Sequence, residues 1–273
     1  MPPALELLTG QATAPGSTFT ALTMATGNTS SVRSATIGSQ IFLATMWGFN
    51  NASGTFRIRS PRLHDNQQGI RVQLNATTPS PRYPRWSFMQ NLIPQDVLIA
   101  EITGTSTSGD FEMGSWLVYY NDLPGVQARF CTPAQLQKWG LNMMGQEVAI
   151  TAGDAGGYSG QVAVNSGTGL DNWKANTDYA LMGYLVDTAC DAVRIQGVDS
   201  GNLGIGGPGW AANTEVTSNW FVWLSSYYGI AMIPMFNAAN KFAILVDVAQ
   251  NQGGAAVNVT FFFVELLPPS LRT

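Results

Sequence analysis

The hydrophobic residues of this chain are grouped in short runs that clusters of turn-forming residues separate. From residue 40 onward, apolar runs recur in the order IFLATMWGF, TFRIR, GIRVQL, RWSFM, DVLIAEIT and SWLVYY. Short runs at such spacing are typical of the strands of a β-sandwich or barrel. Residues 1–40 are rich in Thr, Ser and Gly and are expected to form an extended arm that leads into the first strand. Residues 76–85 contain three prolines and are expected to form a long loop, because proline is excluded from interior strands.

The pattern of the first half returns in the second half. Residues 41–59 match residues 178–196 in shape. An offset of 137 aligns three residues with their counterparts without a gap: Arg57 with Arg194, Ile58 with Ile195 and Trp86 with Trp223. Further on, LIAEITG from Leu98 matches ILVDVAQ from Ile244 at an offset of 146, and SWLVYYNDLP from Ser115 matches VTFFFVELLP from Val259 at an offset of 144. This similarity predicts an internal duplication, with Trp86 and Trp223 at equivalent places in two superposable sandwiches.

Two units of ordinary domain size follow from the duplication. We expect the first sandwich, with its N-terminal arm, over residues 1–130, and a short helix followed by the second sandwich over residues 131–273. The helix is predicted by an N-cap at Thr132, a proline at position 133 and a terminating Gly140. The second half continues with YALMGYLV, AVRIQG, NLGIGG, NWFVWL, MIPMF, KFAILVDVA and NVTFFFVELL. Several of these runs are continuously apolar, which predicts strands covered on both faces, by the other unit or by another subunit.

Charge is scarce and uneven. Charged residues make up 11% of the 273 residues, against about 25% in ordinary soluble chains, and the formal net charge is −4. This balance argues against a dedicated nucleic-acid-binding protein. Six of the 13 basic residues nevertheless fall in one span: Arg57, Arg59, Arg62, Arg71, Arg82 and Arg85. We expect them to serve subunit assembly, by pairing with carboxylates of an adjacent copy, more than to bind phosphates of a genome.

Several motifs are weighed against a purely structural role. Gly204–Gly209 matches G-x-G-x-x-G, but no amphipathic helix follows it, so a loop or bulge is expected. Gly157–Gly160 resembles a nucleophile elbow with the wrong spacing, and its one available histidine, His64, falls in a polar turn. Asp110 and Glu112 could bracket a glycosidic bond but are expected to be solvated at a hairpin tip.

Two further groups could bind ligands. Asp187 and Asp191 could hold a cation, although a turn between strands is the better interpretation. Aromatic residues could stack on sugars or fill a core or an oligomer interface: Trp210, Trp220, Trp223, Tyr227 and Tyr228. The two cysteines, Cys131 and Cys190, are expected to be free thiols, without metal-ligand spacing. No secretory signal or membrane-spanning stretch is visible, so synthesis in a cytoplasm is expected.

Tandem sandwiches, a short helix between them and a surface poor in charge together resemble the double jelly-roll major capsid proteins of tailless icosahedral viruses, including bacteriophage. The resemblance implies an all-β fold of two tandem eight-stranded antiparallel jelly rolls. It also implies a homotrimer that forms a pseudo-hexameric capsomer, then a capsid lattice in the virion, with no catalytic residues, cofactor or metal. A vertex protein and an underlying membrane are further candidate partners, and no specific nucleic-acid sequence is expected to bind. Two alternatives stay open: a virion accessory or receptor protein that binds glycans, and a carbohydrate-active enzyme.

Overall fold

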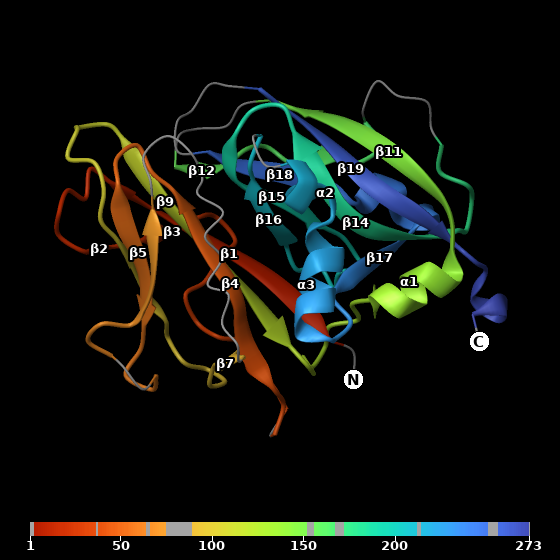
Figure 1. Cartoon of the computed structure of the whole chain (residues 1–273), viewed down its shortest axis with the longest axis horizontal. Helices are drawn as coiled ribbons and strands as arrows, with labels where there is room; N and C mark the ends of the chain where they lie inside the picture. Colours follow the sequence, from red (N-terminus) through yellow and green to blue (C-terminus); the bar gives the residue numbers. More distant parts are fainter. Residues whose placement is uncertain are drawn as a thin grey trace.

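The chain forms two β-sandwiches that lie side by side (Figure 1). The computed structural model describes residues 3–36, 38–63, 66–74, 89–151, 156–166, 172–211, 214–250 and 256–272. The first sandwich is built from β1 to β9 and the second from β11 to β19, with β10 at the edge of the second.

In the first sandwich, a sheet of order β3-β1-β9-β4-β7 faces a sheet of order β2-β8-β5-β6. Without the short β3, the eight strands follow the order of a jelly roll, in which two four-stranded sheets are connected through two Greek keys. The strands are β1 (Ala4–Thr13), β2 (Thr20–Ala21), β3 (Thr23–Met24), β4 (Ile41–Phe49), β5 (Gly54–Arg59), β6 (Ile70–Leu74), β7 (Gln90–Asn91), β8 (Ile99–Ile102) and β9 (Phe111–Tyr120).

The second sandwich repeats this order, with sheets β10-β17-β14-β19-β11 and β12-β18-β15-β16. Its strands are β10 (Phe130–Cys131), β11 (Gly140–Ile150), β12 (Gly157–Tyr158), β13 (Val162–Ala163), β14 (Asp178–Val186), β15 (Cys190–Gln196), β16 (Ile205–Gly209), β17 (Ile233–Asn237), β18 (Leu245–Gln250) and β19 (Val257–Leu266). The strands β11, β12 and β14 to β19 therefore correspond to β1, β2 and β4 to β9, in that order. The predicted all-β fold of two tandem eight-stranded jelly rolls is confirmed.

The predicted residue offsets hold in one sheet of each sandwich and fail by one residue in the other. In β5 and β8, Arg57 lies opposite Glu101, and in β15 and β18, Arg194 lies opposite Asp247, as offsets of 137 and 146 require. In β4 the register shifts at Ala44, and in β14 it shifts at Met182, which sets the offset there to 138.

The same slip appears in the last strand of each sandwich. Just after the shift, Thr45 of β4 pairs with Leu117 of β9, and Gly183 of β14 pairs with Phe262 of β19. The offset between β9 and β19 is therefore 145 rather than 144. Alternate residues of a strand face opposite sides, so this single step decides which side chains point into the core. The predicted equivalence of Trp86 and Trp223 cannot be compared, because Trp86 lies outside the described residues.

Two predicted segments differ from the structure. The expected N-terminal arm is wrong in its first part: β1 is a buried strand between β3 and β9, because its apolar residues at positions 4, 5, 7, 8 and 12 complete the first sheet. The run NWFVWL is helical, in α3 (Trp220–Tyr228), which follows the short α2 (Thr214–Ser218). Both helices belong to the connection between β16 and β17.

The helix between the sandwiches is confirmed as α1 (Pro133–Trp139). Thr132 accepts a hydrogen bond from the backbone of Gln135, and the Gln135 side chain accepts one from the backbone of Thr132, which completes a capping box. Two 3₁₀ helices follow in the second half, η1 (Ala238–Ala243) and η2 (Pro269–Leu271).

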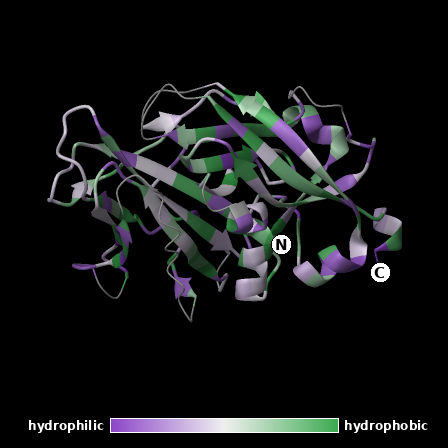
Figure 2. Ribbon diagram, turned by 45° about the horizontal axis from the view of Figure 1, so that its top comes forward, coloured by the Kyte–Doolittle hydropathy of each residue, from purple (hydrophilic) through white to green (hydrophobic). Residues whose placement is uncertain are grey.

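The hydrophobic core is divided unevenly between the sandwiches. One cluster of buried residues lies inside the first sandwich, whereas a larger cluster contains residues of both. The first sandwich contributes the outer side of its sheet β1-β9-β4 to this larger cluster, with buried residues that include Leu5, Leu7, Trp47, Leu117 and Tyr119. We call this contact the seam. Figure 2 shows hydrophobic stretches running along the strands of the second sandwich.

Candidate assembly interface

Three of the six arginines in the basic span gather on the outer face of the first sandwich. Arg57 and Arg59 lie on β5, and both donate to the carboxylate of Glu101 on β8, with Nε to Oε2 distances of 2.7 Å. Arg71 lies opposite Arg57 on β6. The guanidinium of Arg57 lies 3.7 Å above the ring of Phe19, and that of Arg71 lies 5.3 Å from the same ring. The sequence therefore identified an arginine cluster on one face of a sheet.

Arg62 is not part of this cluster. Arg62 donates to the carbonyl of Pro94 at 3.3 Å and lies in a turn after β5. Arg82 and Arg85 lie outside the described residues. Within the cluster, the hydrogen bond from Arg59 holds the pKa of the Glu101 carboxyl below its usual range, although partial burial opposes this shift.

The second sandwich contains the same arrangement of an aromatic ring, an arginine and a carboxylate. Arg194 on β15 donates to Asp247 on β18 at 2.6 and 2.8 Å, and its guanidinium lies 3.6 Å above the ring of Tyr158 on β12. Each member sits on the strand equivalent to that of its counterpart, or next to it in the case of Phe19. The sequence repeat predicted that Arg57 and Arg194 are equivalent. It did not predict their aromatic partners Phe19 and Tyr158, because no local pattern marks these rings as neighbours of the arginines.

The two triads differ in their surroundings. Arg194 and Asp247 of the second triad are buried in the seam, and Thr9 of the first sandwich forms a hydrogen bond of 2.8 Å with the hydroxyl of the partly exposed Tyr158. In the first triad the Arg57 side chain is 13% exposed and that of Glu101 is 9% exposed, whereas Arg71 beside it is exposed. Both sandwiches thus carry such a triad on one sheet, and among the described residues the first sandwich packs on the triad of the second.

A chain of polar contacts crosses the seam next to this triad. The hydroxyl of Ser115 donates to a carboxylate oxygen of Asp191 at 2.5 Å and also hydrogen-bonds with Thr9 at 2.7 Å. The indole of Trp47 donates to the backbone carbonyl of Asp191 at 2.8 Å. Asp191 is fully buried, and burial raises the pKa of its carboxyl to about 7, against hydrogen bonds from Ser115 and the Phe49 backbone that lower it. The structure thus gives Asp191 a place in the seam rather than in a solvated turn.

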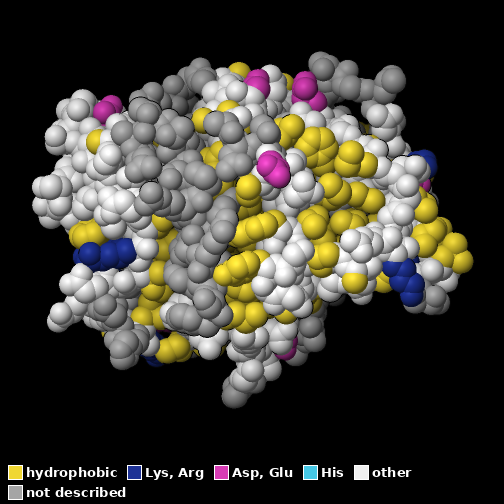
Figure 3. Space-filling model, in the orientation of Figure 1, with side chains coloured by type: hydrophobic (Ala, Val, Ile, Leu, Met, Phe, Trp, Pro, Cys, Tyr) yellow, Lys and Arg dark blue, Asp and Glu magenta, His cyan; other side chains and the backbone are white. Residues whose placement is uncertain are grey.

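The outer side of sheet β11-β19-β14 is the counterpart of the side that the first sandwich buries in the seam. Strand registers pair the buried residues with these counterparts: Leu5 with Met143, Trp47 with Leu185, Leu117 with Phe262, and Tyr119 with Val264. Met143 is 65% exposed, and the other three are partly exposed. In Figure 3, hydrophobic side chains gather over the right-hand part of the molecule, where the second sandwich lies. Among the described residues, α2 packs on Gly183 at the β14 side of this face, and the remaining apolar residues of the face are less buried than their counterparts in the first sandwich.

A cavity of about 570 Å³ opens at one end of the seam. Its wall includes the ion pair of Arg33 with Glu6, at 2.6 Å, and that of Arg194 with Asp247. Each arginine is neutralised by its carboxylate. The guanidinium of Arg194 lies 3.6 Å above one face of the Tyr158 ring, so this face is not open to a sugar.

The glycine motifs that the sequence singled out are structural. Gly204–Gly209 lies in and just before β16, and the amide of Leu7 donates to the carbonyl of Gly204 at 2.8 Å, which confirms a close approach of two backbones. In the segment Gly157–Gly160, the hydroxyl of Ser159 donates to the next carbonyl and accepts from the amide of Val248. His64 lies outside the described residues. These contacts show Ser159 in a backbone-bonding role within the sheet.

The acidic pairs do not converge. Glu112 is fully buried and accepts hydrogen bonds from the backbone amides of Asn51 and Thr105, so the prediction of a solvated tip is wrong for this residue. Asp187 accepts from the backbone and side chain of Asn258, as a turn between strands would. Among the described residues, no group of three or more His, Cys, Asp or Glu is arranged to hold a metal ion.

The aromatic residues fill the core and the seam. Trp210 and Trp220 are buried, and Trp220 stacks on Trp223 with ring centroids 5.8 Å apart. Tyr228 donates to the backbone carbonyl of Ala44 in β4 and so ties α3 to the first sandwich. This arrangement supports the core interpretation over a sugar-stacking surface for most of them.

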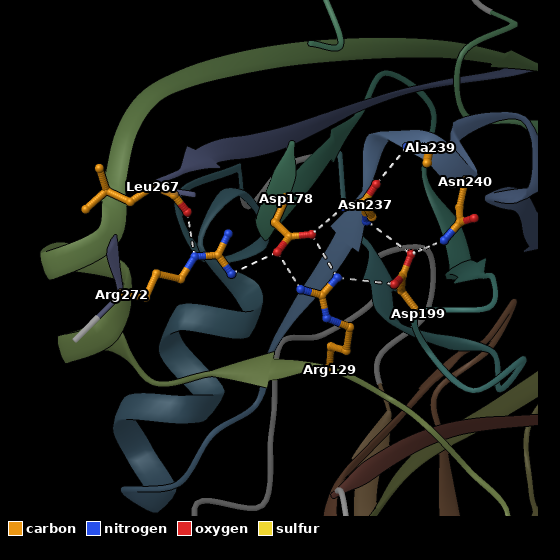
Figure 4. A network of polar contacts seen from close by, with 8 residues as sticks. All are labelled: Arg129, Asp178, Asp199, Asn237, Ala239, Asn240, Leu267 and Arg272. Atoms are coloured by element: carbon orange, nitrogen blue, oxygen red, sulfur yellow. Dashed lines mark hydrogen bonds and ion pairs between the residues drawn. The ribbon is translucent and has the colours of Figure 1, made fainter. Parts of the chain in front are cut away.

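A second polar network fastens the segment between the sandwiches and the C-terminal tail to the second sandwich (Figure 4). Asp178, which is 2% exposed, accepts from Arg129 at 2.8 Å, from Asn237 at 2.7 Å and from Arg272 at 2.8 Å. Burial raises the pKa of the Asp178 carboxyl, but these donors outweigh it and lower the pKa to about 2. Asp199 joins the network through Asn237 and Asn240.

Both cysteines are free and buried, as predicted, and burial raises the pKa of the Cys131 thiol to about 12. Within the described parts of the chain, no helix is both long enough and apolar enough to cross a membrane.

Comparison with known proteins yields only distant likenesses. No protein-family model and no curated protein matches the sequence. Among solved structures, the PBSX exported protein XepA is 10% identical, with a TM-score of 0.24, and the match covers 96% of this chain and 86% of that one. The major capsid protein P2 from bacteriophage PM2 is 6% identical, with a TM-score of 0.23 and 98% coverage of both chains. At these scores the likeness carries no argument about function.

Proposed function

We propose that this chain is a viral structural protein, the major capsid protein of an icosahedral virion, and that its role is structural rather than catalytic. It assembles with copies of itself into a homotrimeric, pseudo-hexameric capsomer, and capsomers tile the shell. The proposal needs no cofactor and no specific nucleic-acid sequence. The protein is made in the host cytoplasm and resides in the virion, where a vertex protein or an underlying membrane are candidate neighbours.

One observation carries the proposal: the apolar outer face of the first sandwich is covered by the second sandwich, whereas its counterpart on the second sandwich is partly exposed among the described residues. Leu117 is fully buried in the seam, but its counterpart Phe262 is partly exposed. An apolar sheet face of this kind is typical of a permanent interface. The first sandwich of another copy could cover this outer face of the second sandwich, in the way that the second sandwich covers the outer face of the first within one chain. Such a contact between copies is head to tail.

Head-to-tail contacts either close into rings or continue as filaments. A ring of three chains places six similar sandwiches around an axis, and the low content of charged residues, 11%, suits a surface that neighbours cover. Three copies would therefore make a capsomer with nearly sixfold shape from one kind of contact between sandwiches.

Sedimentation velocity and negative-stain microscopy of the purified chain test the proposal. We expect trimers with a hexagonal outline, and we expect Met143→Glu combined with Phe262→Glu to give monomers, because charges are placed on the apolar face. Phe242→Glu, on an apolar side chain that is 72% exposed in η1, is the control and should leave trimers intact. A wild-type chain that stays monomeric at micromolar concentration, or that binds glycans as a monomer, would overturn the proposal.

A further inference from the structure

The seam within the chain shows which side chains meet when one sandwich covers another. Leu7 of β1 packs on Gly206 of β16: a Cβ at Gly206 would lie 3.0 Å from Leu7 Cδ2 and 1.9 Å from the carbonyl oxygen of Val193. Two residues along β1, Thr9 bonds to the hydroxyl of Tyr158. Two contacts thus mark this part of the seam: the Leu7 side chain lies over Gly206, and the Thr9 hydroxyl bonds to the Tyr158 hydroxyl.

Strand registers identify the residues that occupy these positions on the two open faces. Counting from the register shifts in β4 and β14, Leu7 corresponds to Gly145 of β11, and Thr9 corresponds to Glu147. On the other side of the contact, Gly206 pairs with Arg194 as Arg71 pairs with Arg57. Arg71 thus corresponds to Gly206. Phe19, beneath Arg57, occupies the place of Tyr158 beneath Arg194.

Side-chain size is exchanged between the two faces. In the seam, Leu7 of the first sandwich lies over Gly206 of the second. At the corresponding positions outside the seam, the outer face of sheet β11-β19-β14 has Gly145 and the outer face of sheet β2-β8-β5-β6 has Arg71. A Cβ at Gly145 would have only Thr260 Cγ2 within 4 Å, at 3.6 Å, so space is open above this residue. Both contacts therefore place a large side chain over a glycine, with the two faces exchanged.

Charge is also complementary. The face around Phe19 carries Arg57, Arg59 and Arg71 against the single carboxylate of Glu101 and so has an excess of positive charge. The opposite face has an exposed carboxylate, Glu147, at the position of Thr9. A carboxylate that meets an arginine pair in a partly desolvated contact forms strong, directional hydrogen bonds.

We propose that Glu147 of one copy pairs with the cluster of Arg57 and Arg71 of the next copy, and that Gly145 of the first copy makes room for the Arg71 side chain. The partner of the arginine face is therefore a second copy of this chain, through the outer face of sheet β11-β19-β14. This inference rests on the proposed self-assembly and specifies its contact.

Charge exchange tests the pairing. Glu147→Arg and Arg71→Glu are each expected to weaken trimer formation at least tenfold in sedimentation velocity, and the double variant Glu147→Arg with Arg71→Glu is expected to restore it. Glu215→Arg, at an exposed acid on α2, is the matched control and should assemble like the wild type. Circular dichroism of each variant monitors folding.

A cross-link provides a second measurement that does not depend on charge. Gly145→Cys combined with Arg71→Cys is expected to give disulfide-linked chains that end at the trimer, whereas either single variant gives none, because both native cysteines are buried. A wild type that forms trimers while the single charge variants also assemble normally, or a double variant that is not rescued, would overturn the pairing and leave the proposed function standing. A monomeric wild type would overturn both.

Discussion

Raising the pH from 5 to 8 is expected to destabilise the folded chain through one group, the buried carboxyl of Asp191. Its pKa is raised to about 7 by burial in the seam, whereas an aspartate in an unfolded chain titrates near 3.9. The folded state therefore binds more protons between these values, so the free energy of unfolding falls as the pH rises through this window. Stability from this group is complete below about pH 4 and is lost as the pH passes about 7.

The magnitude follows from the two pKa values. Between pH 5 and pH 8 the contribution of Asp191 changes by about 3 kcal/mol, since each pH unit between the two pKa values corresponds to about 1.4 kcal/mol. The Asp191 side chain is fully buried, so solvent screening does not reduce this figure.

Urea unfolding at pH 5 and pH 8, at one protein concentration, measures the effect. Asp191→Asn keeps the side-chain shape and still accepts from Ser115, but it cannot titrate. The difference between the two pH values should therefore be about 3 kcal/mol smaller in this variant than in the wild type. Glu215→Gln, at an exposed acid, should behave like the wild type. If Asp191→Asn retains the pH dependence of the wild type, the carboxyl does not titrate as its burial requires.

Two further predictions concern the repeated elements and the linking helix. Asp247→Asn should cost about 3 to 5 kcal/mol of unfolding free energy, because it removes the carboxylate partner of Arg194 in the seam; an unchanged free energy of unfolding would contradict the assigned burial. Thr132→Ala should cost about 1 kcal/mol through loss of the α1 cap, and Thr132→Ser should retain most of it, both measured by urea unfolding.

The sequence alone determined most of the strands and their repetition, because these depend on local patterns; β1 and the helical run at Trp220–Tyr228 are the exceptions. Alternating or continuous apolar runs mark a strand wherever it packs, and the capping residues of α1 act within one turn of helix. The alignment of Arg57 with Arg194 was also correct, since both strands keep an unbroken ladder to the acidic partner on the next strand. Local patterns were therefore sufficient to predict the fold class and the equivalence of the two arginines of the repeated ion pair.

Only the tertiary structure decided which faces are covered. The register shifts at Ala44 and Met182 have no sequence signal, and a shift of one residue exchanges the two faces of a strand. Asp191 reads as part of a polar turn, but packing of the sandwiches places it in the seam. Leu117 and Phe262 are both apolar strand residues, and their different exposure depends on a contact between distant halves of the chain, which no local pattern encodes.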